Sequence, residues 1–379
     1  MPTLSLCMIV KNEEKFLEQC LRSVQSLVDE IVIVDTGSTD KTKEIASKFT
    51  RKIYDFVWCD DFAAARNVSL AHATGDWVLV LDADESLSQR DHSAIKDLIS
   101  AAGSDISGFV LTQRNYFQKM EDMAYGSFKE INVSAAGGEL GFISSKDDTY
   151  TESKQSVGWL PTPIVRLFRR EQQSAFSGRV HEDVSPSLNG KIISATIPFH
   201  HYGKLNPETW KKKWQLYERL GEKKAQEQQD YYVYFELGRQ YLAGKDGEPQ
   251  LEKAKEMFER SILQNSSFWL SWFNLGSIYL IQNDLESARV CLEKALEWNP
   301  QAPQIYLNLG VVYVKQKKQD LAITLFIQGI KQNPSRADLY KNLGLCYLEI
   351  GDQKEAVPLL KKAVELNPEY AKQFTFRGV

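Results

Sequence analysis

The chain has 379 residues, of which 43% are hydrophobic and 25% charged, and its formal net charge is −4. This length leaves room for two domains, and the balanced charge excludes a strongly basic protein, so we expect no nucleic-acid partner. The five cysteines are scattered and lack Cys-x-x-Cys spacing, which argues against a zinc site and suits a reducing compartment.

The first 85 residues alternate between short apolar runs and segments with helical spacing. Runs at residues 4–10, 30–35, 52–57 and 77–82 have the length of buried strands. The segments that follow the first three runs, residues 16–27, 41–49 and 62–73, are predicted helices. This alternation predicts a Rossmann-like α/β domain, with a mostly parallel sheet between helices. The first run is too short for a signal peptide or a membrane span, so we expect a cytoplasmic protein without a transmembrane segment.

Two aspartates, Asp82 and Asp84, follow the fourth predicted strand. The ligand crevice of an open α/β sheet lies at the carboxyl ends of its strands. Alternate side chains of an extended segment point the same way, so both carboxylates can face one site. They would suit a divalent cation that itself holds a diphosphate. The pattern is weak alone, and a pair of exposed loop acids is the alternative.

Four segments of this domain resemble, in order, the motifs of family 2 glycosyltransferases. They are Ile9-Val10-Lys11-Asn12-Glu13-Glu14, Val34-Asp35-Thr36-Gly37-Ser38-Thr39-Asp40, Ala65-Arg66-Asn67 and Leu81-Asp82-Ala83-Asp84. Enzymes of that family have the GT-A fold and use a nucleotide-sugar donor, usually with Mg²⁺ or Mn²⁺. The resemblance implies a GT-A domain over residues 1–203 and a metal-dependent, inverting transfer. By family habit the donor would be a UDP-hexose or a UDP-N-acetylhexosamine.

The resemblance also implies a nucleoside pocket. Asp35 would contact the uracil, since a carboxylate at a strand end can accept from a base N–H or a ribose hydroxyl. Asn12 and Glu13 would line the same pocket. The alternative for Asp35 is a helix cap or a turn acid.

The resemblance also implies roles for three residues that would contact the ribose, the phosphates or the metal. Arg66 would help hold the nucleotide, because its fork of donors matches phosphate oxygens; otherwise it is a surface arginine of an amphipathic helix. Asp82 would meet the ribose or the metal. Asp84 would bind the metal that neutralises the departing diphosphate.

After Glu85, the alternation of strand-like and helix-like segments becomes less regular. We predict a helix over residues 86–99 and strands at 109–112 and 163–169. Residues 117–158 are rich in Gly, Ser, Asp and Lys with little periodicity, and so long a loop is usually functional. By analogy with other enzymes of the GT-A fold, we expect this loop to lie where the acceptor docks.

Gly178-Arg179-Val180-His181-Glu182-Asp183 stands where family 2 enzymes carry the catalytic base. An inverting transferase needs a base near the anomeric carbon, on the side away from the leaving diphosphate. We favour Glu182, because the sequence resembles relatives with a His-Glu pair at this point, and Asp183 is the alternative. Solvated turn acids are the remaining interpretation.

His200 and His201 are adjacent in a predicted strand, so they point to opposite faces. One could therefore face a metal while the other packs. GT-A enzymes often complete the metal shell with a late histidine, and His201 is the candidate here. The alternative is a strand-end histidine hydrogen-bonded to backbone.

The remaining sequence repeats. Residues 204–230 are a predicted helical connector with an apolar line at Trp210, Trp214, Tyr217 and Leu220. From residue 231 on, Asn-Leu-Gly recurs at positions 274, 308 and 342, and Asn-Pro at 299, 333 and 367. This is the tetratricopeptide pattern of paired helices whose small residues allow close approach. We predict an all-α solenoid over residues 231–379, with about four repeats, an insertion near 244–247 and the start of a fifth at 374–378.

This layout predicts a glycosyltransferase whose repeats recruit a peptide or protein acceptor, because holding the acceptor near the active site raises its local concentration. Known glycosyltransferases with the same two parts include ones that glycosylate bacterial peptides. One alternative is a transferase of cell-surface polysaccharide or lipid-linked glycan assembly, with repeats that form oligomers such as a homodimer. The other is a non-catalytic scaffold.

Overall fold

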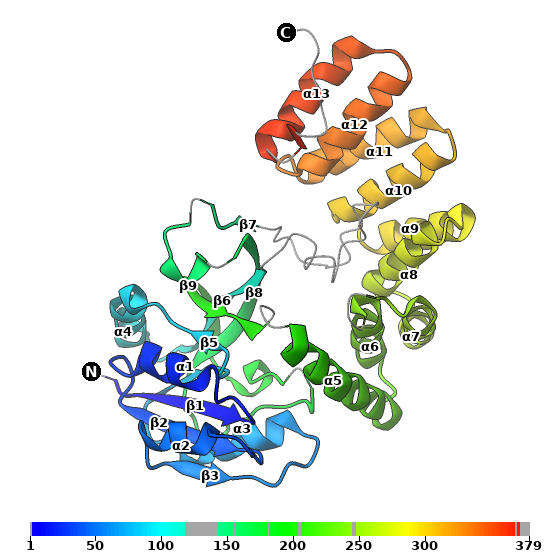
Figure 1. The fold of residues 1–379 in the computed structure, drawn as a ribbon. Helices are drawn as coiled ribbons and strands as arrows, with labels where there is room; N and C mark the ends of the chain where they lie inside the picture. Colours follow the sequence, from blue (N-terminus) through cyan, green and yellow to red (C-terminus); the bar gives the residue numbers. More distant parts are fainter. Residues whose placement is uncertain are drawn as a thin grey trace. The chain divides into compact units, whose positions relative to one another are not determined.

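A computed structural model describes residues 2–117, 143–146, 148–154, 156–180, 182–203, 207–244, 248–367 and 370–371. Among them, the chain divides into two compact units, the first ending at Lys224 and the second beginning at Ala225 (Figure 1). The domain boundaries expected after residues 203 and 230 stay a prediction.

The first unit contains the parallel half of a sheet, in the order β3-β2-β1-β4. These strands are β1 (Leu4–Val10), β2 (Glu30–Asp35), β3 (Ile53–Asp55) and β4 (Trp77–Val80). The first two match the predicted runs residue for residue, and the other two are shorter than predicted. The strand–helix alternation therefore confirms the predicted α/β fold.

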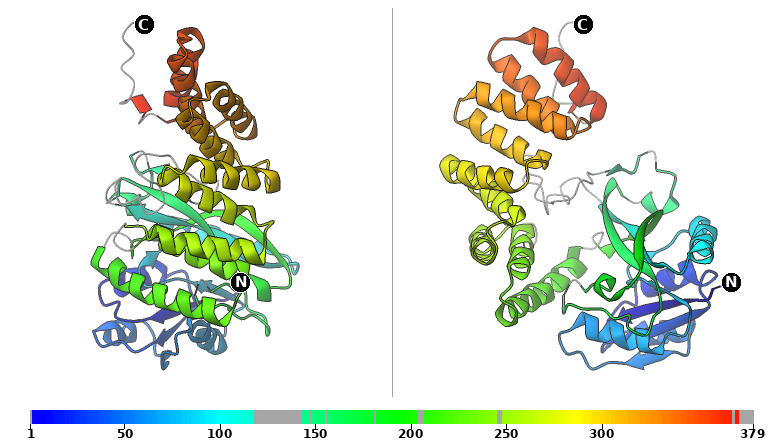
Figure 2. Two further views of the ribbon diagram at one scale, coloured as in Figure 1. Left: turned by 90° about the vertical axis from the view of Figure 1, so that its right-hand side faces the viewer. Right: turned by 180° about the vertical axis from the view of Figure 1, so that it is seen from behind.

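Helices cover both faces of this half (Figure 2). One face of β1, with Leu6 and Met8, packs against α1 (Leu17–Val24) and α2 (Thr42–Ser47). The opposite face, with Cys7, packs against α3 (Phe62–His72). Because successive side chains of a strand alternate between faces, one apolar run supplies both cores.

The other half of the sheet is mixed, and its order is β4-β8-β6-β9-β5. It is built from β8 (Gly158–Arg169), β6 (Ile106–Phe117), β9 (Lys191–His201) and β5 (Glu85–Ser86). Strand β6 pairs antiparallel with β8 and parallel with β9, and the short β7 (Ile143–Ser144) pairs with β8. The topology brings the carboxyl ends of β6 and β9 next to β5.

The predicted helix over residues 86–99 is wrong in its first turn and a half. Glu85 and Ser86 form β5, because they pair with His201 and His200 of β9. A 3₁₀ turn, η1 (Gln89–Asp91), follows, and α4 (His92–Ala101) begins only there. Two further turns are η3 (Thr151–Ser153) and η4 (Ser185–Ser187). Residues 118–142 of the predicted long loop lie outside the described residues.

The predicted connector forms helix α5 (Pro207–Glu227), in which the boundary between the two units falls. The Tyr217 ring lies 5.9 Å from that of Phe62, and Arg219 donates to Asp60 at 2.7 Å. Both contacts lie within the first unit and fasten α5 beside the start of α3. The side chains of Trp210 and Trp214, part of the predicted apolar line, lie outside the described part.

Four helix pairs make up the described part of the second unit. They are α6 (Tyr231–Ala243) with α7 (Leu251–Gln264), α8 (Trp269–Ile281) with α9 (Leu285–Trp298), α10 (Pro303–Lys315) with α11 (Gln319–Gln332), and α12 (Ala337–Glu349) with α13 (Gln353–Leu366). A Cβ added at Gly276 would lie 2.8 Å from Leu292, which explains the recurrent glycine of the first helix. The predicted solenoid is confirmed; residues 245–247 of the insertion and the expected fifth repeat are not described.

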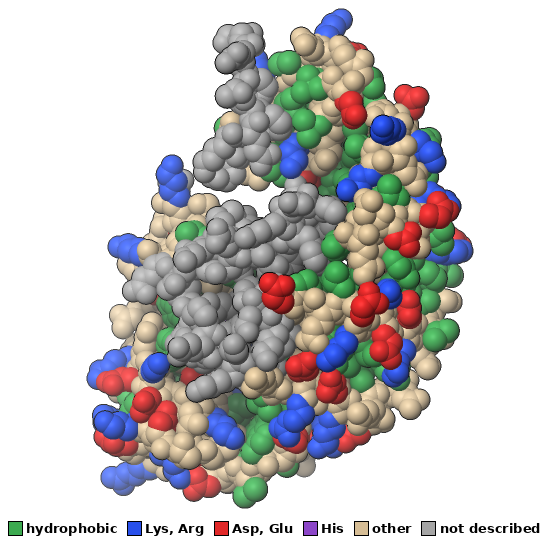
Figure 3. All heavy atoms as spheres, turned by 45° about the vertical axis from the view of Figure 1, so that its right-hand side comes forward, with side chains coloured by type: hydrophobic (Ala, Val, Ile, Leu, Met, Phe, Trp, Pro, Cys, Tyr) green, Lys and Arg blue, Asp and Glu red, His purple; other side chains and the backbone are tan. Residues whose placement is uncertain are grey.

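The surface and the helices show two general features. On the face drawn in Figure 3, Lys and Arg side chains lie interspersed with Asp and Glu. Among the residues that could be searched, no helix combines the length and apolar character needed to cross a membrane.

Candidate active site

Asp35 ends β2 and is only 2% exposed. Its Oδ1 accepts the backbone N–H groups of Gly37 and Ser38, both at 2.9 Å. Its Oδ2 is buried and has no hydrogen-bond partner among the described residues. The alternative interpretation of Asp35 as a turn acid therefore accounts for the contacts of Oδ1 but not for Oδ2. A buried carboxylate oxygen without a donor is costly, so a ligand N–H or O–H would stabilise it.

Asn12 and Glu13 lie in the loop after β1. Asn12 has a φ of +55°, and its Oδ1 accepts from Thr39 N–H at 2.7 Å. Glu13 N–H donates to Thr42 Oγ1 at 2.7 Å, and the Glu13 carbonyl accepts from Leu17 at the start of α1. These two residues tie the loop after β1 to the loop after β2, beside Asp35.

Two arginines bracket Asp82. Arg66 Nη2 donates to Asp82 Oδ1 at 2.6 Å, and Arg166 Nη2 donates to Asp82 Oδ2 at 2.9 Å. Arg66 is 4% and Arg166 8% exposed, so the alternative interpretation of Arg66 as a surface arginine is excluded. Helix α3 carries Arg66 inward from an N-terminus at which the Asp61 carboxylate accepts from Ala64 N–H.

Glu85 closes the turn that follows Asp82. Its Oε2 accepts the Asp82 N–H at 2.8 Å, while its own N–H donates to the Asp82 carbonyl at 3.0 Å. Its Oε1 accepts from Gln113 Nε2 at 2.6 Å and from Arg166 Nη2 at 3.1 Å. Glu85 thus contacts both the backbone of Asp82 and the arginine that binds the Asp82 carboxylate, so the turn over residues 82–85 is held from both sides.

The buried charges shift one another's pKa. Burial alone would raise the pKa of Asp82, but the charges of Arg166 and Arg66 hold it well below its ordinary value. Burial raises the pKa of Glu85 to about 7, against the pull of Arg166. For Arg66, the charges of Asp82 and Glu182 outweigh burial and raise its pKa. Asp82 and both arginines are therefore charged at neutral pH.

Glu182 and Asp183 have separate surroundings. Glu182 Oε1 accepts from Arg66 Nε at 2.6 Å, and its side chain is 15% exposed. Asp183 Oδ1 accepts from the N–H and the hydroxyl of Ser185, at 2.9 and 2.7 Å, and its side chain is exposed. The structure thus brings Glu182 into the cluster around Arg66 and leaves Asp183 in a turn. His181 lies outside the described residues.

Asp84 and His201 meet where β4 and β9 end. Asp84 Oδ2 lies 3.6 Å from His201 Nε2, and Asp84 is 3% exposed. His201 Nδ1 forms a 2.8 Å hydrogen bond with Asn115 Oδ1. The Asn115 amide nitrogen donates to the Leu160 carbonyl at 3.3 Å, which leaves its oxygen as the acceptor. His201 Nδ1 therefore donates to Asn115, and Nε2 is the ring nitrogen that faces Asp84.

The donor set fits a divalent cation. Two ligands about 2.1 Å from one ion lie between about 3 and 4 Å apart, depending on the angle at the ion. A Cβ at Gly203 would lie 2.7 Å from His201 Nε2, so the glycine keeps room beside both ligand atoms. Among the described residues, no three His, Cys, Asp or Glu side chains gather to hold a metal by themselves. Donor phosphate oxygens and water would supply the other ligands, as is usual for Mg²⁺.

His200 faces the other way. It is fully buried, its Nδ1 is 2.7 Å from the Tyr116 hydroxyl, and its ring stacks on that of Tyr116. Burial lowers its pKa to about 4, so it is neutral at pH 7. The alternation expected for adjacent strand residues thus separates a packed histidine from the one beside Asp84.

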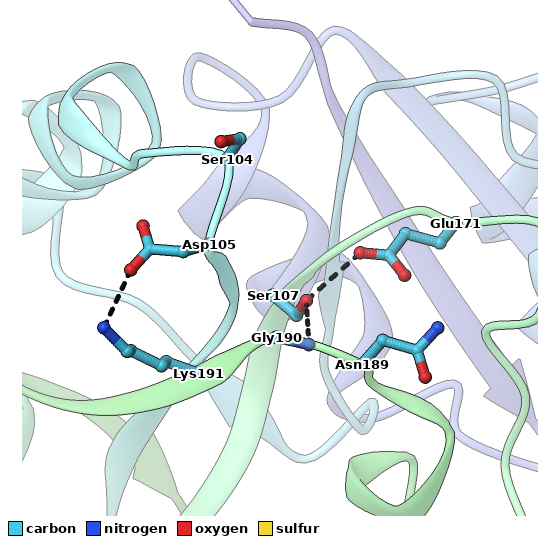
Figure 4. A pocket seen from close by; sticks show the side chains of 7 residues that line it. All are labelled: Ser104, Asp105, Ser107, Glu171, Asn189, Gly190 and Lys191. Atoms are coloured by element: carbon cyan, nitrogen blue, oxygen red, sulfur yellow. Dashed lines mark hydrogen bonds and ion pairs between the residues drawn. The ribbon is translucent and has the colours of Figure 1, made fainter.

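A pocket at the opposite end of β6 and β9 contains none of the predicted residues (Figure 4). Ser107 Oγ donates to Glu171 and accepts from Gly190 N–H, and Lys191 pairs with Asp105 (Figure 4). Its lining consists of Ser104, Asp105, Ser107, Glu171, Asn189, Gly190 and Lys191. Because none of the predicted residues lines this pocket, the candidate active site is the one at the Asp84 end of the sheet.

Sequence reasoning missed Arg166, Glu85 and Asn115. A single arginine within the apolar run Ile164-Val165-Arg166-Leu167-Phe168 was a usable signal, because a charge in a buried strand needs a buried partner. Glu85 directly follows the aspartate pair and could have been included with it. Nothing in the sequence indicates that Asn115 meets His201.

The α/β domain and the helical repeats are each matched by models of known families. Residues 5–134 match the family model for glycosyl transferase family 2. Residues 276–317, 303–336 and 337–370 match models of the tetratricopeptide repeat. The chain therefore carries an N-terminal family 2 glycosyltransferase domain and C-terminal tetratricopeptide repeats, as the resemblance implied.

Individual relatives share parts of the chain. A TPR repeat-containing protein of Synechococcus elongatus is 33% identical over 213 residues, 54% of this chain and 43% of the relative. The SPbeta prophage-derived glycosyltransferase SunS of Bacillus subtilis is 33% identical over 102 residues, 25% of this chain and 23% of SunS. The chain thus spans less than half the length of these relatives. Among solved structures, MamA is similar over 44% of this chain and 95% of its own, at 24% identity and a TM-score of 0.39.

Proposed function

We propose that the chain is a metal-dependent, inverting glycosyltransferase that moves a sugar from a nucleotide-sugar donor to an acceptor. The observation that carries the proposal is the Asp84–His201 pair, with 3.6 Å between Oδ2 and Nε2, at the ligand edge of a family 2 domain. A buried carboxylate beside an imidazole lone pair is a stable arrangement when a cation lies next to both.

The donor's nucleoside would bind at the end of β2. Asp35 Oδ2, which is buried and accepts from no donor in the described part of the chain, would accept the N3–H of uracil. Asn12 and Glu13 stand beside it in the loop after β1 and would border the pocket. UDP is therefore the nucleotide we propose, carrying a hexose or an N-acetylhexosamine.

The diphosphate would bind at the end of β4. Asp84 and His201 would hold Mn²⁺ or Mg²⁺, and the bound metal neutralises charge on the leaving diphosphate. Both oxygens of Asp82 already accept from arginines, so we assign Asp82 to the ribose rather than to the metal. Arg66 retains a buried Nη1 that has no partner within the described ranges, which fits a role in holding the nucleotide.

Glu182 would act as the general base. Its carboxylate would take the proton of the acceptor while the acceptor attacks the anomeric carbon and the bond from that carbon to the UDP oxygen breaks. Attack opposite the leaving group inverts the configuration. Glu182 is preferred over Asp183 because it lies in the cluster with Arg66 and Asp82, whereas Asp183 is engaged with Ser185.

The acceptor we propose is a peptide or protein that the repeats recruit. A binding module in the same chain raises the effective concentration of its ligand at the active site. The cysteines of the described residues are free thiols, which fits a reaction in the cytoplasm.

Nucleotide binding tests the proposal. UDP, GDP, CDP and ADP would be titrated calorimetrically with and without Mn²⁺, and UDP-sugars would then be tested for slow hydrolysis, with water as acceptor. We expect metal-dependent binding of UDP alone and its loss in Asp35→Leu, which removes the acceptor for N3–H. Absence of binding by every nucleotide would contradict a transferase and favour a non-catalytic scaffold.

A further inference from the structure

The proposed function assigns no role to Arg166, although this residue contacts Asp82 in the candidate active site. It lies in β8, across the β4–β8 pairing from the end of β4, and its guanidinium lies over the Phe199 ring at 5.6 Å. Its Nη2 is shared between Asp82 Oδ2 at 2.9 Å and Glu85 Oε1 at 3.1 Å. One buried nitrogen thus joins the two ends of the turn that carries Asp84.

We propose that Arg166 is a positioning residue for donor and metal binding, which acts through Asp82 and Glu85 without contacting the donor. The proposal rests on the proposed function, because it concerns the same site. It adds a residue that lies outside the four motifs of the resemblance.

Burial supports action through Asp82. The Arg166 side chain is 10% exposed, whereas that of Asp82 is 36% exposed. Asp82 is therefore the more accessible member of the pair, and its carboxylate accepts from Arg166 on one oxygen and from Arg66 on the other. A ligand in the site would meet Asp82 before it met Arg166.

Charge explains what Arg166 does there. Without it, the half-buried carboxylate of Asp82 and the buried carboxylate of Glu85 would share no cation, and among the described residues Arg66 alone would still donate to the Asp82 carboxylate. Like charges at short range repel, so the two carboxylates would move apart. That movement would loosen the turn, in which Glu85 Oε2 accepts the Asp82 N–H, and would displace Asp84 relative to His201.

Metal-dependent UDP binding by the full chain tests this role. Arg166→Gln is expected to weaken UDP binding about 10- to 100-fold at fixed Mn²⁺, the range typical when residues that orient metal ligands are replaced. It should also raise the Mn²⁺ concentration needed for half-maximal binding. Arg166→Lys keeps a positive charge between the two carboxylates and should recover part of both losses.

A double-mutant cycle separates the indirect role from direct contact. If Arg166 acts through Asp82, the loss in Asp82→Asn/Arg166→Gln is smaller than the product of the losses in the single variants. Losses that multiply would show that Arg166 contacts the donor independently and would overturn the proposal, as would unchanged UDP and Mn²⁺ binding in Arg166→Gln. If the wild type itself binds no nucleotide with Mn²⁺, the proposed function fails, and this inference fails with it.

The matched control is Arg169→Gln in the same strand. Arg169 donates to the carbonyls of Ile106 and Gly103 and lies over the Trp77 ring at 4.7 Å. Its replacement should lower the melting temperature without changing UDP affinity. If Arg166→Gln does not fold, Arg166→Lys and Glu85→Gln probe the same contacts, and wild-type binding by both variants would overturn the proposal.

Discussion

Glu182 and Asp183 are adjacent in the chain, yet their carboxylates have different neighbours. Arg66 holds Glu182 beside Asp82, whereas Asp183 accepts from Ser185 in an exposed turn. Glu182→Gln should reduce sugar transfer by about 10²- to 10⁴-fold, the usual contribution of a general base, because the amide cannot take the acceptor proton. UDP affinity measured by calorimetry should be retained.

Asp183→Asn is the control, and it should transfer sugar at close to the wild-type rate. Loss of UDP binding in Glu182→Gln would mean that Glu182 serves to hold Arg66 in place rather than to remove a proton.

Asn115 fixes which nitrogen of His201 carries the proton. Asn115→Leu removes the acceptor of the Nδ1–H, so His201 can turn or change tautomer, and Mn²⁺ affinity should fall about 10- to 100-fold. The metal dependence of UDP binding measures this change. Asn115→Asp keeps an acceptor oxygen and should bind Mn²⁺ better than Asn115→Leu; equal affinity in the two variants would contradict an orienting role.

For single residues, the sequence predicted the site residues that belong to recognisable motifs. It missed the residues that hold those site residues in place. Asp35 ends β2, and Asp82 and Asp84 come shortly after β4, so their common edge could be inferred from strand order. Arg166 lies 84 positions from Asp82, and Asn115 lies 86 from His201. Such pairs arise from the pairing of β4, β8, β6 and β9, which local periodicity does not encode.

Glu30, at the start of β2, joins several elements of the sheet. It accepts from Ser5 Oγ of β1 at 2.5 Å, from Thr74 N–H at 2.7 Å, and from Lys52. Burial alone would raise the pKa of Glu30, but the hydrogen bonds from Lys52, Ser5 and Thr74 lower it to about 2 from 4.5. The stabilisation is therefore complete above pH 4.5 and is lost as the pH falls toward 2.

Glu30→Gln should lower the free energy of unfolding of the first unit by about 2–3 kcal/mol at pH 7, following about 1.4 kcal/mol per pKa unit. Urea unfolding at pH 7, 5 and 3 should show the difference from wild type shrinking below pH 5. UDP affinity at pH 7 should be unchanged, because Glu30 lies at the other end of β2 from Asp35. A difference that stays constant down to pH 3 would contradict the assigned pKa.

Among the elements, the parallel half of the sheet was predictable, because each of its first three strands is followed by a helix that returns the chain to the sheet. The mixed half was not. The expected helix at residue 86 is a strand because Glu85 and Ser86 find partners in β9, more than 100 residues later. Pairing with a strand that is distant in the sequence therefore outweighed the helical spacing of the apolar residues there.

For the whole molecule, the division into two units predicts that damage to the repeats spares the donor site. A Cβ at Gly310 in α10 would lie 2.7 Å from Phe326 Cζ, so Gly310→Val should overpack that helix pair and destabilise the repeats by about 1–3 kcal/mol. UDP affinity with Mn²⁺ should match the wild type, whereas sugar transfer to a peptide acceptor should fall.

Lys331→Ala, at an exposed position of α11, is the control and should change neither property. A loss of UDP affinity in Gly310→Val that parallels the loss of helical signal would contradict independent units.

The central claim is that Asp84, with His201, holds a metal that binds the donor's diphosphate. Titration of UDP into wild type and Asp84→Ala over a series of Mn²⁺ concentrations tests it most directly. We predict that UDP affinity rises with Mn²⁺ in the wild type and does not respond in Asp84→Ala, while the repeats unfold at the same temperature in both. An equal response to Mn²⁺ in the two proteins would contradict the claim.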